Sequence, residues 1–337
     1  MTAPDFLASL ATIALAAIIC AVVTWVIMPL LARYALARPN ARSSHRLPTP
    51  QGAGIAVMIA TLSVAGGIIA FISPVEASFP ATLFGATVMI ALVGAADDVR
   101  SIPIVPRLAL QALAVGAVMI AIPGDLRLLP IGPQWIERAI LFTAGLWFIN
   151  LVNFMDGLDW MTVVEIAPIT GALTALGLFG ELPPSATIVA AALCGAILGF
   201  APFNRPIAKV FLGDVGSLPI GLLVGWCLLE LALRHHLAAA LLLPLYYLAD
   251  ASLTLVRRLL NREPVWLAHR THFYQRATDN GFSVLEVVSR VLATNLALVI
   301  LAGTSIMLRS TAADLVALAC GAATVALLLV QFSRPRR

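Results

Sequence analysis

The sequence predicts an all-α polytopic membrane protein with about 11 transmembrane helices, and three observations support this fold class. Of the 337 residues, 61% are hydrophobic and only 11% are charged, whereas soluble domains have about 25% charged residues. The mean hydropathy is +0.97. Apolar runs close to the roughly 20 residues that a helix needs to cross a bilayer recur along the whole chain. A water-soluble fold is excluded, and no composition break divides residues 1–337, so we expect a single integral membrane domain.

Eleven apolar runs mark the predicted crossings. They lie at 6–32, 53–73, 79–96, 105–122, 136–151, 161–179, 185–200, 215–233, 237–256, 284–307 and 313–332. The first run is expected to remain as a helix, because residues 1–5 contain no basic residue and no small-residue cleavage pattern precedes the arginines at its far end. An odd number of crossings places the two termini on opposite sides of the membrane.

The distribution of basic residues predicts the orientation. Most of the 21 lysines and arginines lie in loops on one side of the predicted membrane, and only Arg127, Arg138, Arg234 and Arg309 lie in loops on the other. Lysine and arginine are enriched in short cytoplasmic loops. We therefore expect the N-terminus outside and the C-terminus in the cytoplasm. The same loops contain nearly all of the chemically reactive side chains, at the boundary where polar groups are costly and therefore functional candidates.

The first group of reactive side chains is the pair Asp97 and Asp98, which follows an apolar run at a helix C-terminus. The helix dipole disfavours negative charge at that end, and adjacent carboxylates also repel each other. Such a pair needs a cation or a protonated member. A solvated loop start with Arg100 as counter-charge is the simpler interpretation, and a metal or proton-transfer site is the functional one.

The second group is rich in asparagine and aspartate. A spacing of three places Asn150, Asn153 and Asp156 on about one face of a helix. Gly157 then allows the backbone to turn, so that Asp159 can point back at a ligand. Two amides and two carboxylates supply hard oxygen ligands for Mg²⁺ and polar groups for a base or a sugar. An ordinary helix end would favour basic residues instead.

The third group surrounds Asp214 at a predicted helix N-terminus. A capping carboxylate there stabilises a helix by about 0.3 to 1 kcal/mol and needs no further role. The same position also suits a metal-bound phosphate, because Gly213 and Gly216 allow close backbone approach. Phe211, at the membrane edge among polar residues, either stacks on a nucleobase or packs as a lipid-facing or core aromatic side chain.

Two basic loops complete the set. His269, Arg270 and His272 lie in one of them, and His45 and Arg46 lie in the other. Arginine binds phosphate or carboxylate through two parallel hydrogen bonds, although anchoring by positive charge alone would also explain the longer loop. Oxygen ligands for Mg²⁺ beside basic loops at a membrane surface indicate phosphoryl chemistry between a cytoplasmic nucleotide and a lipid.

These motifs resemble those of the polyprenyl-phosphate N-acetylhexosamine-1-phosphate transferases, the MraY/WecA-like glycosyltransferase family 4. The resemblance rests on five segments in order: SSHRLPTPQGAG at 43–54, the aspartate pair, NLVNFMDGLD at 150–159, FNRPIAKVFLGDVGS at 203–217 and AHRTHFYQR at 268–276. It implies ten or eleven helices around a cytoplasm-facing groove in the bacterial cytoplasmic (inner) membrane. The lipid phosphate would enter this groove from the inner leaflet.

The resemblance implies transfer of a sugar-1-phosphate from a UDP-N-acetyl sugar to undecaprenyl phosphate, with release of UMP. It implies a bound Mg²⁺, with Mn²⁺ as an alternative, whose ligands are Asn153 and Asp214. It also implies that Asp159 and Phe211 bind uracil and that Asp97 deprotonates or positions the lipid phosphate. The expected catalytic residues are Asp97, Asp98 and Asp156; the expected metal ligands are Asn153 and Asp214; the expected substrate-binding residues are Asn150, Asp159, Phe211, His45, Arg46, His269, Arg270 and His272.

Two departures from the family pattern bear on the substrate. AHRTH stands where the peptidoglycan members have a triple-histidine loop, which favours the O-antigen, capsule or exopolysaccharide branch and an N-acetylated hexosamine or 6-deoxyhexosamine. Phospho-N-acetylmuramoyl-pentapeptide transfer remains the alternative within the family. Gln51-Gly-Ala-Gly replaces the commoner basic residue followed by three glycines. The resemblance also admits a homodimer, and nothing in the sequence indicates a nucleic-acid partner.

A secondary transporter is the alternative from another functional class. Its polar residues would lie near the bilayer midplane on broken helices in repeated halves, whereas here they gather at one face and no repeat is evident. Asp250 and Arg290 are the exceptions inside predicted spans. We interpret them as a buried pair or as groups that extend to the membrane surface.

Overall fold

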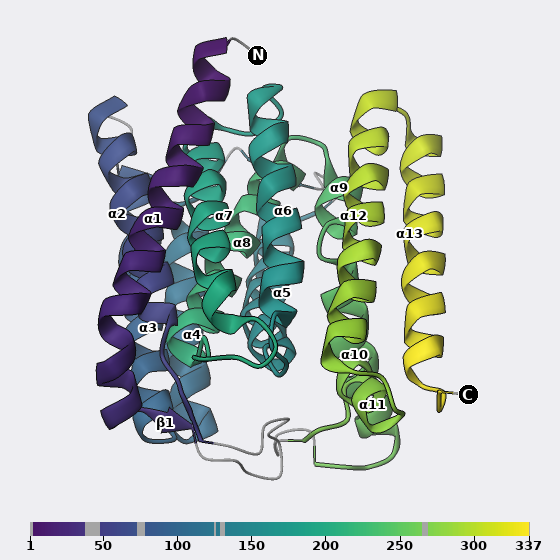
Figure 1. The fold of residues 1–337 in the computed structure, drawn as a ribbon. Helices are drawn as coiled ribbons and strands as arrows, with labels where there is room; N and C mark the ends of the chain where they lie inside the picture. The colour runs from purple at the N-terminus through teal and green to yellow at the C-terminus, as the bar shows by residue number, and fades with distance from the viewer. Residues whose placement is uncertain are drawn as a thin grey trace.

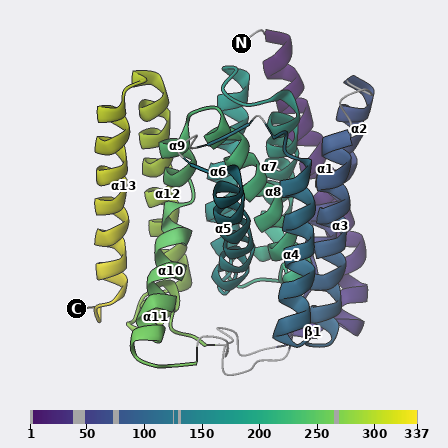
Figure 2. The same ribbon diagram turned by 180° about the vertical axis from the view of Figure 1, so that it is seen from behind.

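The computed structural model describes residues 3–37, 48–72, 78–124, 126–128, 132–264 and 269–336. Within these ranges the chain forms a bundle of long helices that run side by side (Figure 1). The chain enters at one end of the bundle and leaves at the other, so the two ends of the chain lie at opposite ends of the molecule (Figures 1 and 2). The strands β1 (Leu36–Ala37) and β2 (Thr49–Pro50) form a short antiparallel pair at the C-terminal end of the first helix.

Ten helices in the described residues are long and apolar enough to cross a membrane, which confirms the predicted fold class. They are α1 (Ala3–Tyr34), α2 (Gly54–Ile72), α3 (Ser78–Val99), α4 (Ile104–Ala121), α5 (Gln134–Met155), α6 (Met161–Leu178), α7 (Pro184–Asn204), α8 (Asp214–Leu233), α12 (Val284–Leu308) and α13 (Thr311–Phe332).

The predicted crossing at 237–256 is not one helix. It is divided into α9 (Leu237–Leu242) and α10 (Leu245–Leu260), which together lead from one end of the bundle to the other (Figure 1). Pro244 stands at the break, and proline has no backbone N–H to continue a helix. The short helix α11 (Phe273–Asp279) follows α10 at the lower end of the bundle, where β1 lies on the opposite side (Figure 1).

Helix α8 lies at the centre of the bundle. Within its most apolar stretch of 18 residues, 83% are buried, against 17% in the corresponding stretch of α1. Two glycines allow neighbouring backbones to contact its first turn. A Cβ at Gly94 of α3 would collide with the Asp214 backbone carbonyl, and a Cβ at Gly54 of α2 would collide with the backbone of Gly216. Small residues permit such close packing between membrane helices. The end of α3 and the start of α2 are therefore held directly against the start of α8.

Candidate active site

The end of α3 and the start of α8 bring Asp97 and Asp214 together beside one arginine. The Asp97 Oδ1 atom accepts a hydrogen bond from the Ile102 backbone N–H at 2.5 Å, and its Oδ2 atom accepts one from Arg107 Nη1 at 2.8 Å. The same guanidinium nitrogen lies 3.8 Å from Asp214 Oδ2. Arg107, from the first turn of α4, thus partly neutralises two carboxylates that lie 117 residues apart in the chain.

The two predicted metal ligands are in direct contact. The Asn153 Nδ2 group, near the end of α5, donates hydrogen bonds to Asp214 Oδ1 at 2.8 Å and to Ser217 Oγ at 2.9 Å. Ser217 lies in the same helical turn as Asp214, at the start of α8. Carboxylate, amide and hydroxyl groups from α5 and α8 therefore meet at one point.

Asp98 points to different partners from its neighbour Asp97. Its Oδ1 atom accepts a hydrogen bond from the Asp214 backbone N–H at 2.9 Å, and its Oδ2 atom accepts one from the Val215 N–H at 3.0 Å. The Gln51 side-chain amide also donates to the Asp98 carboxylate. The first N–H groups of a helix have no partner within it. Asp98 supplies acceptors for two of them at the start of α8.

Asp156 immediately follows α5. Its carboxylate accepts a hydrogen bond from Thr162 Oγ1 at 2.5 Å. Burial of the carboxylate raises the pKa of Asp156 to about 7, assisted by repulsion from Asp98 and Asp159 and opposed by the Thr162 hydrogen bond. A carboxyl group with such a pKa can accept or release a proton near neutral pH.

Asp159 and Phe211, the predicted uracil-site residues, both belong to the packing of the connection between α7 and α8. The buried Asp159 carboxylate accepts a hydrogen bond from the Ala208 backbone N–H at 2.9 Å. The Phe211 backbone is fixed on both sides, because its N–H donates to the Pro50 carbonyl at 2.8 Å and its carbonyl accepts from the Ala53 N–H at 3.0 Å. The half-buried Phe211 ring is therefore carried by a rigid backbone.

Asp250 is completely buried in α10 and stabilises the start of α11. It accepts hydrogen bonds from the backbone N–H groups of Phe273 and Tyr274, both at 3.0 Å, and its Oδ1 atom lies 3.3 Å from His272 Nδ1. Of the two interpretations offered for Asp250 and Arg290, the buried pair is therefore wrong. Arg290 donates to Gln331 Oε1 at 2.8 Å, because α12 directs it toward α13.

The loop with the three predicted binding residues packs against the end of α5. The His269 and His272 rings stack with centroids 4.9 Å apart, and His272 lies 6.4 Å from the Phe154 ring. Tyr274 Oη donates to the Phe154 carbonyl at 3.0 Å. Arg270 bends back toward α11, where it pairs with Asp279 at 3.2 Å. The histidines thus lie beside the segment that contains Asn153 and Asp156, whereas Arg270 is engaged elsewhere.

Three predicted site residues are not placed in this cluster. Asn150 is buried, and its Nδ2 group donates to Gln111 Oε1 of α4 at 2.7 Å and to the Leu146 carbonyl at 2.8 Å. It braces α5 against α4. His45 and Arg46 lie outside the described residues.

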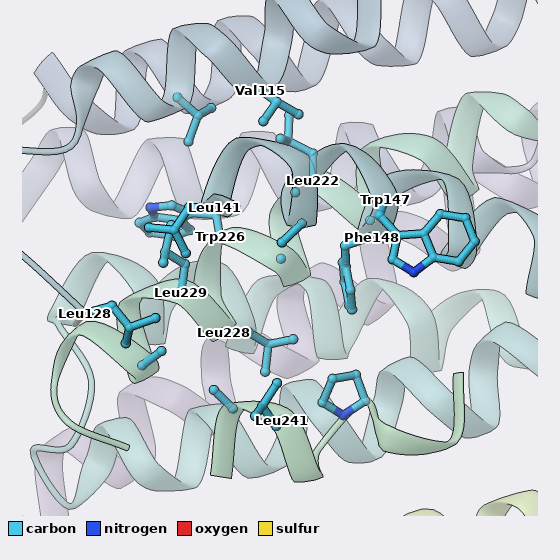
Figure 3. A pocket seen from close by; sticks show the side chains of 18 of the residues that line it. Val115, Leu128, Leu141, Trp147, Phe148, Leu222, Trp226, Leu228, Leu229 and Leu241 are labelled. Carbon is cyan, nitrogen blue, oxygen red and sulfur yellow. The ribbon is translucent and has the colours of Figure 1, made fainter. Parts of the chain in front are cut away.

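An apolar cavity of about 220 Å³ lies between α4, α5, α8 and α9 (Figure 3). Phe148 of α5 and Leu222 of α8 contribute to its lining. Each stands five residues from a polar residue of the cluster, Asn153 and Ser217 respectively, which is less than two helical turns. The cavity therefore begins close to the polar cluster and extends into the apolar part of the bundle.

Comparison with known proteins shows which family the chain resembles. The model of "Glycosyl transferase family 4" matches residues 80–232, a range that contains Asp97, Asn153, Asp159 and Asp214. A protein named as a probable undecaprenyl-phosphate N-acetylglucosaminyl 1-phosphate transferase, from Bacillus subtilis, is 25% identical over 277 residues, which are 77% of this chain and 75% of the relative. The chain is thus similar to glycosyl transferase family 4 over a little less than half of its length.

Other relatives match shorter regions of the chain. The decaprenyl-phosphate N-acetylglucosaminephosphotransferase of Mycolicibacterium smegmatis is 30% identical over 57% of this chain and 52% of its own. The phospho-N-acetylmuramoyl-pentapeptide-transferase of Streptococcus thermophilus is 34% identical over 40% of each chain. This chain thus spans about half or less of these two relatives. All three names describe phosphotransferases, which is the enzyme class expected from the sequence.

The side chains of the candidate site are suitable ligands for a small, hard cation. Among the described residues, no three histidine, cysteine, aspartate or glutamate side chains converge as a metal site. Asp97 and Asp214 nevertheless provide two carboxylates, and the Asn153 amide and the Ser217 hydroxyl lie within hydrogen-bond distance of Asp214 or of each other. Mg²⁺ is typically bound by one or two carboxylates and keeps several waters for exchange with substrate phosphates. The site has this character.

Four residues of the candidate site were not predicted from the sequence: Gln51, Arg107, Thr162 and Ser217. Ser217 lies inside the FNRPIAKVFLGDVGS segment, and that membership was the one signal available for it. Arg107 and Thr162 are ordinary residues of helix first turns in the sequence. Their partners are defined only by the packing of α3, α4, α5 and α8.

Proposed function

We propose that this protein is a glycosyl transferase family 4 enzyme that transfers a sugar-1-phosphate from a UDP-N-acetylhexosamine, or an N-acetylated 6-deoxyhexosamine, to undecaprenyl phosphate and releases UMP. A lipid phosphate oxygen attacks the sugar-bearing phosphorus of the donor, and the bond from that phosphorus to the UMP oxygen breaks. The observation that carries this proposal is the meeting of Asp97, Asn153 and Asp214 at one end of a membrane bundle. The relatives named for undecaprenyl and decaprenyl phosphate support the acceptor class.

The proposal includes Mg²⁺, with Mn²⁺ as a substitute, held by Asn153 and Asp214. When bound, the cation would neutralise the donor diphosphate. The protein itself contributes the remaining charge balance through Arg107, which already lies between Asp97 and Asp214. Asp97 is positioned to receive the proton of the acceptor phosphate or to orient it. Asp156, whose pKa is raised to about 7, can exchange a proton near neutral pH.

Substrate recognition is assigned to the loops around this cluster. We assign the uracil ring to Phe211 and Asp159, whose positions are fixed by the connection between α7 and α8. The sugar and phosphates are assigned to His269, Arg270 and His272. For Arg270, binding requires release from Asp279, an exposed partner that a substrate phosphate can replace. His45 and Arg46 are assigned to the same substrate side, and Asn150 is assigned to support α5 through Gln111.

The lipid tail requires an apolar surface that starts near the polar cluster. The cavity between α4, α5, α8 and α9 meets both conditions, and its lining is almost entirely apolar. We place the first isoprene units there, with the lipid phosphate directed toward Asp97. This arrangement is consistent with an enzyme of the bacterial inner membrane whose soluble donor approaches from the cytoplasm.

Phospho-N-acetylmuramoyl-pentapeptide transfer is a second candidate, because the streptococcal relative with that name is 34% identical over its matched region. The donor therefore has to be identified by direct comparison. We favour a simple N-acetyl sugar, since AHRTH occupies the histidine loop, and we assign the product to O-antigen, capsule or exopolysaccharide synthesis.

The test is UMP release by purified protein in liposomes, with a panel of UDP-N-acetyl sugars and the muramoyl-pentapeptide donor. We expect release only when undecaprenyl phosphate and Mg²⁺ are both present. Asp214→Asn should lower the rate at least a hundredfold, on the order of the loss when one electrostatic group of an active site is removed. Glu263→Gln, at an exposed carboxylate that pairs with Arg258, is the matched control and should retain activity. UMP release without the lipid, or solute flux without UMP, would contradict the proposal.

A further inference from the structure

Asp98 has three hydrogen-bond donors, and all of them belong to the protein. Two are the backbone N–H groups of Asp214 and Val215, and the third is the Gln51 side-chain amide. Asp97, one residue earlier, faces Arg107 and the Asp214 side chain instead. The two adjacent carboxylates therefore differ in what their oxygens contact.

We propose that Asp98 is a positioning residue, which acts with Gln51 as a clasp that fixes the first turn of α8 and thereby the Asp214 carboxylate. The Asp98–Gln51 clasp rests on the function proposed above and goes beyond it by separating the roles of two neighbouring aspartates. Asp97 would meet the substrate, whereas Asp98 would hold the ligand-bearing helix in place.

The hydrogen bonds at the start of α8 show why a clasp is needed. The N–H groups of Gly216 and Ser217 donate to the Gly213 carbonyl at 3.0 Å each, so they are satisfied locally. The N–H groups of Asp214 and Val215 precede the first helical hydrogen bond and depend on an outside acceptor. Asp98 is that acceptor, and a negative charge there also interacts favourably with the helix dipole. The same side chain thus sets the direction in which α8 begins.

Gly213 allows this close approach. Its φ of 79° is in the left-handed region, and a Cβ at this position would lie 2.5 Å from Asp98 Oδ2. A residue with a side chain here would push the carboxylate away from the N–H groups of α8. The contact between Asp98 and α8 is therefore built into the backbone on both sides.

Gln51 connects the clasp to the nucleotide side of the site. Its backbone N–H donates to the Ala35 carbonyl at 2.8 Å, and it forms a β-bridge with Phe211. The side chain of the same residue reaches Asp98. Opening the clasp should therefore disturb both the metal ligand Asp214 and the segment that carries Phe211. A change at Asp97 should not have this double effect.

The experiment compares Asp98→Ala, Asp98→Asn and Asp97→Asn in the full-length protein in liposomes. Asparagine keeps one acceptor oxygen in place of the two of aspartate, and alanine keeps none. We expect Asp98→Ala to weaken Mn²⁺ binding, followed by electron paramagnetic resonance, on the order of tenfold, and to lower UMP release in parallel. Asp98→Asn should recover part of both losses, because one of the two backbone N–H groups keeps its acceptor. Asp97→Asn should lose UMP release, with no recovery of the kind expected for Asp98→Asn.

Amide hydrogen exchange of the peptide that contains residues 214–217 gives a readout independent of activity. Exchange should accelerate in Asp98→Ala and should accelerate less in Asp98→Asn, which keeps one acceptor oxygen. If Asp98→Ala does not fold, Gln51→Glu is the second variant, because a carboxylate facing Asp98 should open the clasp by repulsion. Gln51→Lys, which keeps a donor, is its control.

Two results would overturn the clasp. One is Asp98→Asn as inactive as Asp98→Ala, which would show that Asp98 contacts substrate or metal. The other is unchanged amide exchange at 214–217 in Asp98→Ala or Gln51→Glu. If no variant and no preparation releases UMP, the proposed function fails, and the exchange and Mn²⁺ measurements still decide the clasp.

Discussion

Asp156 and Asp97 carry the same functional group in different surroundings. Burial and the nearby carboxylates raise the pKa of Asp156 to about 7, and the hydrogen bond from the Thr162 hydroxyl opposes this shift. Asp97 is paired with the Arg107 guanidinium at 2.8 Å, a partner that favours the charged carboxylate. At the scale of single residues, the site therefore combines a carboxylate that exchanges protons near neutral pH with one that is held beside a fixed positive charge.

Phe211 gives the prediction at this scale. If its ring stacks on uracil, Phe211→Ala should raise the KM for the UDP-sugar about tenfold, since stacking of a base on an aromatic ring contributes roughly 1 to 3 kcal/mol. The KM for undecaprenyl phosphate should change less than twofold. Steady-state kinetics with each substrate varied in turn is the measurement.

The matched control for Phe211 is Ile207→Ala, at an apolar side chain of the same connection that is 83% exposed. This variant should leave both KM values close to those of the unsubstituted enzyme. Equal increases in the two KM values for Phe211→Ala would count against base stacking and would indicate a general distortion of the connection.

Some contacts of the candidate site follow from sequence motifs and others do not. Asn153 and Asp214 each lie in a motif and were predicted as ligands of one metal ion, and the structure places Asn153 Nδ2 2.8 Å from Asp214 Oδ1. Gln51 lies in the segment at 43–54, but neither it nor Arg107 was predicted to contact an aspartate. Their roles depend on which helix ends meet, and that is decided by backbone packing at Gly94 and Gly54.

At the scale of helices, buried acidic side chains stabilise the starts of other helices. Asp98 of α3 accepts from the first turn of α8, and Asp250 of α10 accepts from the first turn of α11. Glu165 of α6 lies beside the backbone N–H of Tyr247 in the first turn of α10. Inside a membrane protein, water cannot satisfy these N–H groups everywhere, so protein acceptors have to.

These contacts also explain why the divided crossing was predicted as one helix. The hydropathy of 237–256 is high on average, and a charged residue such as Asp250 looks like an isolated polar group in an apolar run. In the structure, this carboxylate accepts hydrogen bonds from the first backbone N–H groups of α11, which packs against α10. Hydropathy reports the average cost of burial, whereas the break depends on Pro244 and on a partner helix that comes later in the chain.

Glu181 gives a prediction for the connections at the other end of the bundle. It joins the segment after α6 to the segments after α8 and α12, because His236 Nε2 lies 2.8 Å and Arg309 Nη2 3.2 Å from its carboxylate oxygens. The hydrogen bond from His236, followed by the charges of His236 and Arg309, lowers the pKa of Glu181.

A lowered carboxyl pKa contributes stability that is fully present above the unfolded value, about 4.3 for glutamate, and is lost as the pH falls through the folded value. Glu181→Gln should therefore lower the thermal unfolding temperature in detergent at pH 6 to 7. The difference from the unsubstituted protein should shrink as the pH falls below about 4. A difference that stays constant over this range would show that charge is not the cause.

At the scale of the whole molecule, the fold was the most predictable property, because hydropathy is a local quantity that needs no knowledge of packing. Of the eleven crossings predicted from the apolar runs, ten correspond to spanning helices with bounds within a few residues. The gathering of the site at one end also followed, since alternate helix ends must lie on the same side. What stayed hidden was which of the polar residues at that end touch each other.

The predicted orientation is tested by labelling. Because basic residues concentrate in the loops on the side of the active site, we expect that side to face the cytoplasm. With the native cysteines replaced, Trp135→Cys at the opposite end should react with a membrane-impermeant maleimide in intact cells. Arg205→Cys, after α7, should react only after the cells are opened. The reverse pattern would place the site outside and would contradict use of a cytoplasmic nucleotide sugar.

Each of the buried acidic residues described above precedes, in the chain, the helix start that it contacts. Asp98 precedes the helix start that it serves by 116 residues, and Asp250 and Glu165 also precede theirs. A ribosome makes the chain from the N-terminus onward. Each of these helix starts therefore leaves the ribosome after its acceptor. The carboxylate is already present in the nascent chain when the N–H groups that it accepts from are synthesised.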